Sequence, residues 1–157
     1  MKRILFAGCL FAIITVFAAG VLSVNAQTVS GSLGNGTVSR GSTAKGSIVL
    51  NIPGGLHVNS SRPNSEYAIA TVVRISGQGV RTGGISYPRG RNRKFQFSEN
   101  VINVYEGRVS IPFTVTVPAS FRGDVVRIRA VVRYQACTDE VCYPPKNKDV
   151  TITAKVR

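Results

Sequence analysis

The chain has 157 residues, of which 20 are basic and seven acidic, and its formal net charge is +13 at neutral pH. One histidine, one methionine and no tryptophan leave too few ligands for a blue-copper centre, and a zinc site would need a carboxylate to complete it. No metal site or cofactor is therefore expected. A Ser-His-Asp triad would have to use the same histidine, His57, and nothing in its sequence context supports one.

The N-terminal segment has the features of a secretory signal peptide. Lys2 and Arg3 precede a long apolar run, and small residues lead up to Ala26. We expect residues 1–26 to be removed by cleavage after Ala26, which would leave 27–157 as one domain without a stable membrane anchor, either periplasmic or secreted. A retained anchor is the alternative, because the apolar run is almost long enough to span a bilayer.

Beyond residue 26, apolar and polar side chains alternate with a period of two, which is typical of strands that bury one face. The segment 27–43 is rich in Gly, Ser and Thr, and we expect its start to be loosely ordered. Expected strands follow in chain order at 36–40, 47–52, 68–75, 84–87, 95–97, 101–105, 109–117, 125–135 and 149–156. About seven to nine short strands separated by turns indicate an all-β antiparallel sandwich.

Turn-forming residues separate the expected strands. They mark turns at 35–36, 53–55, 83–84, 106–107 and 122–124. Pro112 lies inside an expected strand. Because proline cannot donate a ladder hydrogen bond, a sheet edge or a bulge suits this residue better than a central position.

The basic residues do not form a single block. Without Lys2 and Arg3 the chain keeps 18 basic and seven acidic residues, a net charge of about +11. One group alternates along an expected strand and another lies in an expected loop: Arg127, Arg129 and Arg133, then Arg89, Arg91, Arg93 and Lys94. Solvated strand faces and loops account for this pattern. An acidic protein partner or the envelope surface is the alternative, and export argues against nucleic acid.

Cys137 and Cys142 are the cysteines that remain if the signal peptide is removed, and four residues separate them. Such a pair can form a structural disulfide, bind a metal, or cycle between oxidised and reduced forms. A metal would need His57 and a carboxylate, and a lone histidine more often lies in a turn or on the surface. Closing so short a loop stabilises a fold by only about 2 kcal/mol. A bridge at a strand end is also easy for another thiol to reach, which favours exchange while leaving an ordinary surface disulfide open.

Two short motifs around these cysteines are recognisable. Tyr-Gln-Ala-Cys at 134–137 and Cys-Tyr-Pro-Pro-Lys at 142–146 closely resemble the cysteine hairpin of the disulfide bond corrector family. Its best-known member is the N-terminal periplasmic domain of the thiol:disulfide interchange protein DsbD. Weaker matches lie in the same order at 53–60, 87–88, 104–107 and 109–112. The resemblance covers about residues 30–157.

The resemblance implies an immunoglobulin-like β-sandwich that relays electrons between a thioredoxin-like donor and periplasmic or extracellular protein partners. Cys137 and Cys142 would be the redox pair of such a thiol-disulfide oxidoreductase. Cys142 would form the mixed disulfides with partners, and Cys137 would resolve them. An aromatic cap loop shields the cysteines in DsbD, and Tyr87 or Phe95 in the loop 87–97 could serve in that place, but the resemblance selects no cap residue.

The chain departs from the family pattern in two respects. Four residues rather than five separate its cysteines, and its sequence shows neither a membrane electron conduit nor a thioredoxin-like domain. A redox donor is therefore expected in trans. A non-enzymatic binding or scaffold sandwich with a structural disulfide is the alternative function.

Overall fold

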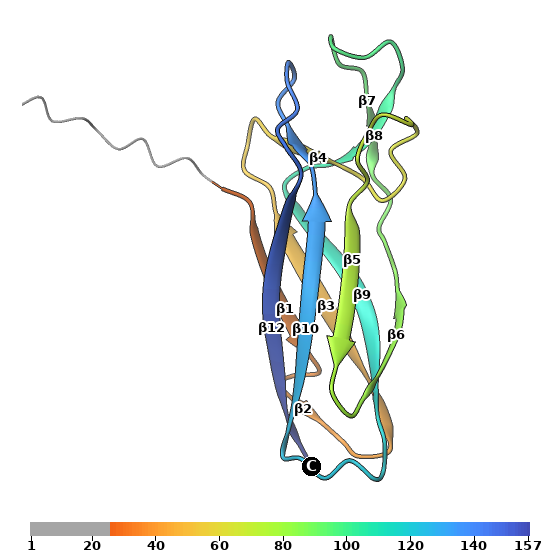
Figure 1. Ribbon diagram of the computed structural model, residues 1–157, viewed down its shortest axis with the longest axis vertical. Helices are drawn as coiled ribbons and strands as arrows, with labels where there is room; N and C mark the ends of the chain where they lie inside the picture. The colour runs from red at the N-terminus through yellow and green to blue at the C-terminus, as the bar shows by residue number, and fades with distance from the viewer. Residues whose placement is uncertain (1–25) are drawn as a thin grey trace, which may run out of the picture.

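The computed structural model of the protein describes residues 26–157, which form twelve strands and no helix (Figure 1). This part of the chain accordingly offers no helix that is long and apolar enough to cross a bilayer. The expected signal peptide, apart from Ala26, lies outside the described residues, so its cleavage stays a prediction.

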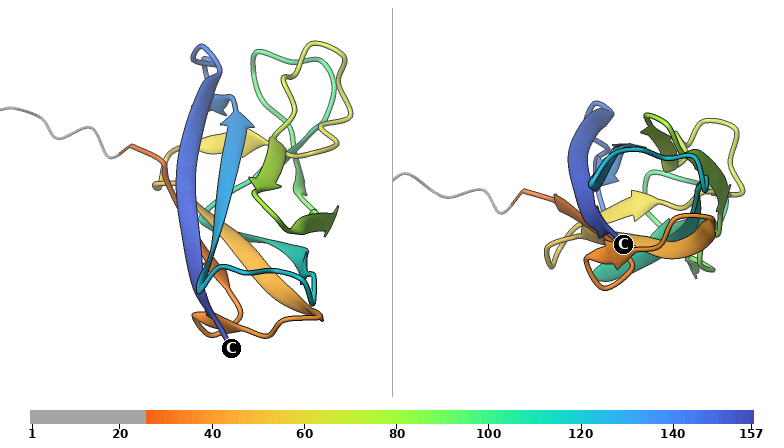
Figure 2. Two further views of the ribbon diagram at one scale, coloured as in Figure 1. Left: turned by 60° about the horizontal axis from the view of Figure 1, so that its bottom comes forward. Right: turned by 90° about the horizontal axis from the view of Figure 1, so that it is seen from below.

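Two four-stranded sheets form the body of the domain. Sheet A is antiparallel and has the order β1-β3-β9-β6, with β1 (Thr28–Leu33), β3 (Ser42–Asn51), β9 (Arg108–Val117) and β6 (Arg81–Ile85). Sheet B has the order β2-β12-β10-β5, with β2 (Thr37–Val38), β12 (Lys146–Val156), β10 (Val125–Tyr134) and β5 (Val72–Gly77). In sheet B, β2 runs parallel to β12 and the other pairs are antiparallel. Figures 1 and 2 show the two sheets facing each other.

A smaller sheet caps one end of this sandwich. Sheet C has the order β11-β4-β8-β7, with β11 (Ala136–Cys137), β4 (His57–Asn59), β8 (Ile102–Tyr105) and β7 (Arg91–Arg93). Figure 1 shows it at the top, at the end opposite the C-terminus. Sheet C therefore gathers segments that are up to 80 residues apart, because His57 is the register partner of Cys137.

The main core lies between sheets A and B, because every second side chain of each long strand points inward. The central strands β9 and β10 supply nearly half of it: Val109, Ile111, Phe113, Val115 and Val117, then Val126, Ile128, Ala130, Val132 and Tyr134. The sandwich also closes at its sides, where β1 lies beside β12 and β5 beside β6. At Gly46 of β3 the ring of Phe113 occupies the place of a side chain, so glycine alone fits there.

The expected all-β, immunoglobulin-like sandwich is confirmed, and the strand expected at 109–117 lies within β9. There are more strands than expected, because several short ones carry little apolar pattern. The start of 27–43 is one case: Thr28–Leu33 pairs along its whole length with β3 and forms the edge of sheet A. The strand expected at 95–97 is wrong, because these residues form a turn and the strand is Arg91–Arg93 instead.

The turn expected at 83–84 is also wrong, because both glycines lie within β6. The register of β6 against β9 shifts between Thr82 and Ile85, so the glycines mark a bulge rather than a chain reversal. Pro112 lies in a central strand, opposite the end of β6, and its carbonyl accepts a hydrogen bond from Ser86 at 2.9 Å. Both the edge and the bulge expectations for Pro112 are wrong, because the register shift lies between Phe113 and Val115 while Pro112 pairs in regular register with Ser47 of β3.

The outer face of sheet B carries the alternating arginines as expected. Arg127, Arg129 and Arg133 are exposed along β10, and Arg129 forms an ion pair of 2.6 Å with Asp149 of β12. Since both side chains of this pair are more than half exposed, the pair adds little to stability.

Candidate functional site

The two cysteines lie on a hairpin between β10 and β12, and they form a disulfide with a Cα–Cα distance of 4.0 Å. They face each other as an isolated antiparallel bridge. A backbone hydrogen bond of 2.8 Å lies on either side of it, from Thr138 N–H to Val141 and from Tyr143 N–H to Ala136. The hairpin thus holds the two sulfurs together through its backbone as well as through the covalent bond.

The turn between the cysteines is fixed by Thr138. Its hydroxyl oxygen accepts hydrogen bonds from the N–H groups of Glu140 and Val141, at 3.2 and 3.1 Å. A threonine at the start of a turn commonly closes the chain in this way. Four residues therefore suffice to reverse the chain between Cys137 and Cys142.

The two sulfur-bearing residues differ sharply in exposure. Cys137 is completely buried, whereas Cys142 is half-buried and lies on the open edge of sheet C. The neighbours of Cys142 are apolar and exposed, with Val141 at 52% and Tyr143 at 45%. An incoming sulfur can therefore approach Cys142 across an apolar surface, while Cys137 is covered.

Cys137 lies beside His57 in sheet C, because β11 pairs with β4 and these residues are register partners. Directly opposed side chains of an antiparallel pair lie on the same face of the sheet. The other face, with Val58, Tyr105 and Ala136, joins the main core. The disulfide and His57 thus share the face of sheet C that points away from that core.

A loop covers this outer face. Phe95 stacks on the imidazole of His57, with ring centroids 4.2 Å apart and an interplanar angle of 13°. Phe97 stacks on Phe95 at 5.2 Å, and the guanidinium of Arg93 lies 5.9 Å from the Phe95 ring. Phe95 is buried in a small apolar cluster with Ile102 and Val104.

Of the two aromatic residues considered for the cap loop, Phe95 lies on the face that carries the cysteines. Tyr87 does not: its hydroxyl accepts a hydrogen bond from the N–H of Val73 at 2.8 Å, and its ring packs against the main core. The stack of Phe97, Phe95 and His57 therefore lies on the face of sheet C that carries the disulfide.

The expectation that His57 lies in a turn or on the surface is wrong. It lies in β4 and is 3% exposed. Burial lowers the pKa of its imidazole, the carboxylates of Asp139 and Glu106 oppose this effect, and Arg93 adds to it. His57 is therefore a neutral imidazole at neutral pH, beside the buried cysteine.

Comparison with known proteins identifies the family. A sequence profile described as "Thiol:disulfide interchange protein DsbD, N-terminal" matches residues 36–154, which include both cysteines and most of the three sheets. The chain belongs to this family. It is a thiol-disulfide interchange domain of the DsbD N-terminal type.

Two solved structures are similar to this DsbD N-terminal family member. The N-terminal periplasmic domain of ScsB from Proteus mirabilis matches with a TM-score of 0.52 and 13% identity, over 84% of this chain and 47% of that chain. The reduced N-terminal domain of Neisseria meningitidis DsbD matches with a TM-score of 0.49 and 19% identity, over 81% of this chain and 85% of that chain. A search of curated protein sequences gave no match. At 13% identity, the similarity to the ScsB domain is evidence for the fold alone.

In this member of the DsbD N-terminal family, a buried amide pair anchors the hairpin. Asn59 of β4 is 2% exposed, and its Nδ2 donates to Gln135 Oε1 at 3.1 Å and to the carbonyl of Ile69 at 3.2 Å. The hydroxyl of Thr71 donates to the carbonyl of Asn59. These bonds join the start of the cysteine hairpin to β4 and to the loop that precedes β5.

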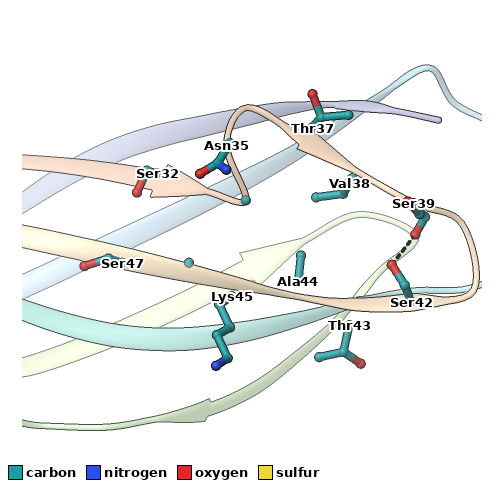
Figure 3. A pocket seen from close by; sticks show the side chains of 12 residues that line it. Ser32, Asn35, Thr37, Val38, Ser39, Ser42, Thr43, Ala44, Lys45 and Ser47 are labelled. Atoms are coloured by element: carbon teal, nitrogen blue, oxygen red, sulfur yellow. Dashed lines mark hydrogen bonds between the residues drawn. The ribbon is translucent and has the colours of Figure 1, made fainter.

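Hollows elsewhere on the domain do not contain the cysteines. One of about 500 Å³ lies between the turn that carries Asn35 and the start of β3 (Figure 3). Half of its lining residues carry a hydroxyl group, and Lys45 is its one charged side chain. A larger hollow of about 910 Å³ contains Arg62 and Arg89 but neither cysteine nor His57. Between residues 26 and 157, no group of three or more His, Cys, Asp or Glu side chains is arranged to hold a metal ion.

Proposed function

We propose that the domain exchanges its Cys137–Cys142 disulfide with thioredoxin-like proteins, and that Cys142 is the sulfur that the partner meets. The observation that carries this proposal is the difference in exposure between a completely buried Cys137 and a half-buried Cys142. Attack on a disulfide requires access to one sulfur in line with the bond, so the exposed sulfur is the one that exchanges.

The exchange conserves electrons and needs no cofactor. A partner thiolate attacks Sγ of Cys142, a new intermolecular S–S bond forms, and Cys137 leaves as a thiolate. The second thiol of the partner then attacks its own bridged sulfur and releases Cys142, so the partner is oxidised and the domain gains two electrons and two protons. The same steps in reverse pass the electrons to a second partner.

The periplasm or the extracellular space is the compartment that this chemistry favours. The similar ScsB domain is described as periplasmic. A signal peptide at residues 1–26 would deliver the domain there, and exposed disulfides persist in oxidising compartments. The apolar surface around Val141 and Tyr143 is where a partner would contact the hairpin.

A scaffold with a structural disulfide is the second candidate function. The observation that favours it is the backbone pairing of the hairpin, which would hold the two sulfurs together in any event. On this view the bridge adds a small stabilisation, and the exposed residues around it bind a partner without redox chemistry.

The reduction potential of the pair distinguishes the two functions. Equilibration of the protein in glutathione redox buffers, followed by alkylation and mass spectrometry, gives the fraction that is reduced. An exchange module is expected to have a potential above about −300 mV, since structural disulfides of exported proteins generally lie below that value. A lower potential, together with no mixed disulfide formed with glutathione, would favour the scaffold.

A further inference from the structure

A row of chemically active side chains crosses sheet C next to the disulfide. Cys142 bridges to Cys137, and Cys137 is the register partner of His57. On the far side of β4, Val58 pairs with Tyr105, so one further step along the same register places Glu106 opposite His57. Directly opposed side chains have Cβ atoms about 4.5–5.5 Å apart. The row therefore consists of the two bridged sulfurs, an imidazole and a carboxylate.

The imidazole in this row adjoins the buried sulfur. His57 is the neighbour of Cys137, and Cys142 lies one strand further away. Cys137 must gain or lose a proton in every catalytic cycle, yet it is completely buried. Burial in apolar surroundings disfavours the thiolate, so a proton acceptor beside Cys137 would accelerate its attack.

The nitrogens of His57 are able to exchange protons. Among the described residues, the hydroxyl of Tyr134 is the one buried polar side-chain atom without a hydrogen-bond partner. The imidazole nitrogens of His57 have no hydrogen-bond partner within residues 26–157 and are not among the fully buried unpaired atoms, so they keep some contact with solvent. A proton taken from Cys137 can thus leave through His57.

The charges around His57 suit this role. Asp139 lies in the hairpin turn, Glu106 follows β8, and Arg93 lies on β7, where it forms an ion pair of 2.7 Å with Glu106. The two carboxylates favour a transient imidazolium, while burial and Arg93 keep the resting ring neutral. A neutral ring beside two carboxylates can accept a proton and release it again.

We propose that His57 accepts the proton of Cys137 when Cys137 resolves a mixed disulfide, and returns a proton to Cys137 when the intramolecular bridge is opened. In the resolving step the Cys137 thiol gives its proton to the imidazole, and its thiolate attacks Sγ of Cys142. The Cys137–Cys142 bond forms, the bond to the partner breaks, and the partner leaves as a thiolate that takes up a proton from solvent. This role rests on the proposed exchange function and adds a proton-transfer residue to it.

The rate increase that His57 can give to the resolving step depends on the fraction of Cys137 that is thiolate without it. A free cysteine with a pKa near 8.5 is about 3% thiolate at pH 7, so full deprotonation would raise the rate by about thirtyfold. Burial makes the unaided thiolate scarcer still. Loss of His57 is therefore expected to slow the resolving step by about tenfold or more.

The test uses the reduced protein and a limiting amount of the aromatic disulfide 5,5′-dithiobis(2-nitrobenzoate). Release of the first aromatic thiol reports attack by Cys142, and release of the second reports resolution by Cys137. The protein concentration is raised until the second, concentration-independent step limits the rate. His57→Gln is expected to slow that step by about tenfold or more at pH 7 and to change the first by less than about twofold.

The pH profile and a packing control separate proton transfer from structure. The wild-type resolving rate is expected to level off above the pKa of His57, whereas the variant rate should keep rising towards the pKa of the thiol. His57→Phe retains a ring to stack on Phe95 and should be as slow as His57→Gln. Glu106→Gln removes a charge that raises the pKa of His57, so the midpoint of the resolving step should move to lower pH.

A wild-type resolving rate and pH profile in His57→Phe would overturn the role of His57, because packing alone would then suffice. Equal slowing of both steps in His57→Gln would do the same. If both His57 variants fail to fold, an unchanged midpoint in Glu106→Gln would contradict the proposal. Absence of both thiol-release steps in the wild-type protein would instead contradict the exchange function itself.

Discussion

Cys137→Ser is expected to accumulate a stable mixed disulfide with glutathione through Cys142, whereas Cys142→Ser should form almost none. Cys142 is half-buried, whereas Cys137 is completely buried. Access controls how fast a cysteine exchanges, so the two single variants should differ in rate by more than about a hundredfold. Incubation with oxidised glutathione, followed by intact-mass spectrometry, measures both rates directly.

The two serine variants are controls for each other. Each loses the same disulfide, which stabilises the domain by about 2 kcal/mol, so their unfolding transitions should be similar. Equal rates of mixed-disulfide formation in the two variants would contradict the assignment of Cys142 as the exchanging sulfur. A faster rate in Cys142→Ser would reverse the roles of the two cysteines.

Asn59→Leu is expected to lower the free energy of unfolding by about 2–3 kcal/mol, because the two hydrogen bonds from the buried Asn59 amide to Gln135 and Ile69 would be lost. Asn59 donates from β4 to Gln135 Oε1 and to the carbonyl of Ile69, and it is 2% exposed. Since Gln135 leads directly into the hairpin, the variant should also loosen the position of Cys137. Urea denaturation followed by circular dichroism measures the change.

Asn51→Leu is the matched substitution on the surface. Its amide donates to the hydroxyl of Thr28 at 3.2 Å on the outer face of sheet A. Exposed substitutions of this kind usually change stability by less than about 0.5 kcal/mol. If both variants lost the same stability, the buried amide pair would not anchor the hairpin.

The strands that the sequence predicts well are those with strict alternation over a long run. Residues 109–117 and 125–134 place an apolar side chain at every second position over a long run, and they form the central strands β9 and β10. The short strand β1 shows no comparable pattern, since only Leu33 of its six residues is buried. Its position depends on the ladder with β3, a tertiary interaction that local sequence does not reveal.

The cysteine pair is visible in the sequence because both residues lie on one short hairpin. The position of His57 is not, because its pairing with Cys137 joins residues 80 positions apart. The same holds for Phe95, which lies in a turn and stacks on His57 across sheet C. A clue to His57 exists in the motif at 53–60, which resembles a strand-end motif of the family and contains the histidine.

The proposed function is electron exchange between the Cys137–Cys142 pair and a thioredoxin-like dithiol. Mixing the oxidised protein with reduced thioredoxin, quenching with an alkylating agent and weighing both proteins by mass spectrometry tests this exchange most directly. Cys137 and Cys142 are expected to become alkylated while an equal amount of thioredoxin becomes oxidised. A pair that stays oxidised at a large excess of reduced thioredoxin would contradict the exchange function and leave a structural disulfide in a binding scaffold.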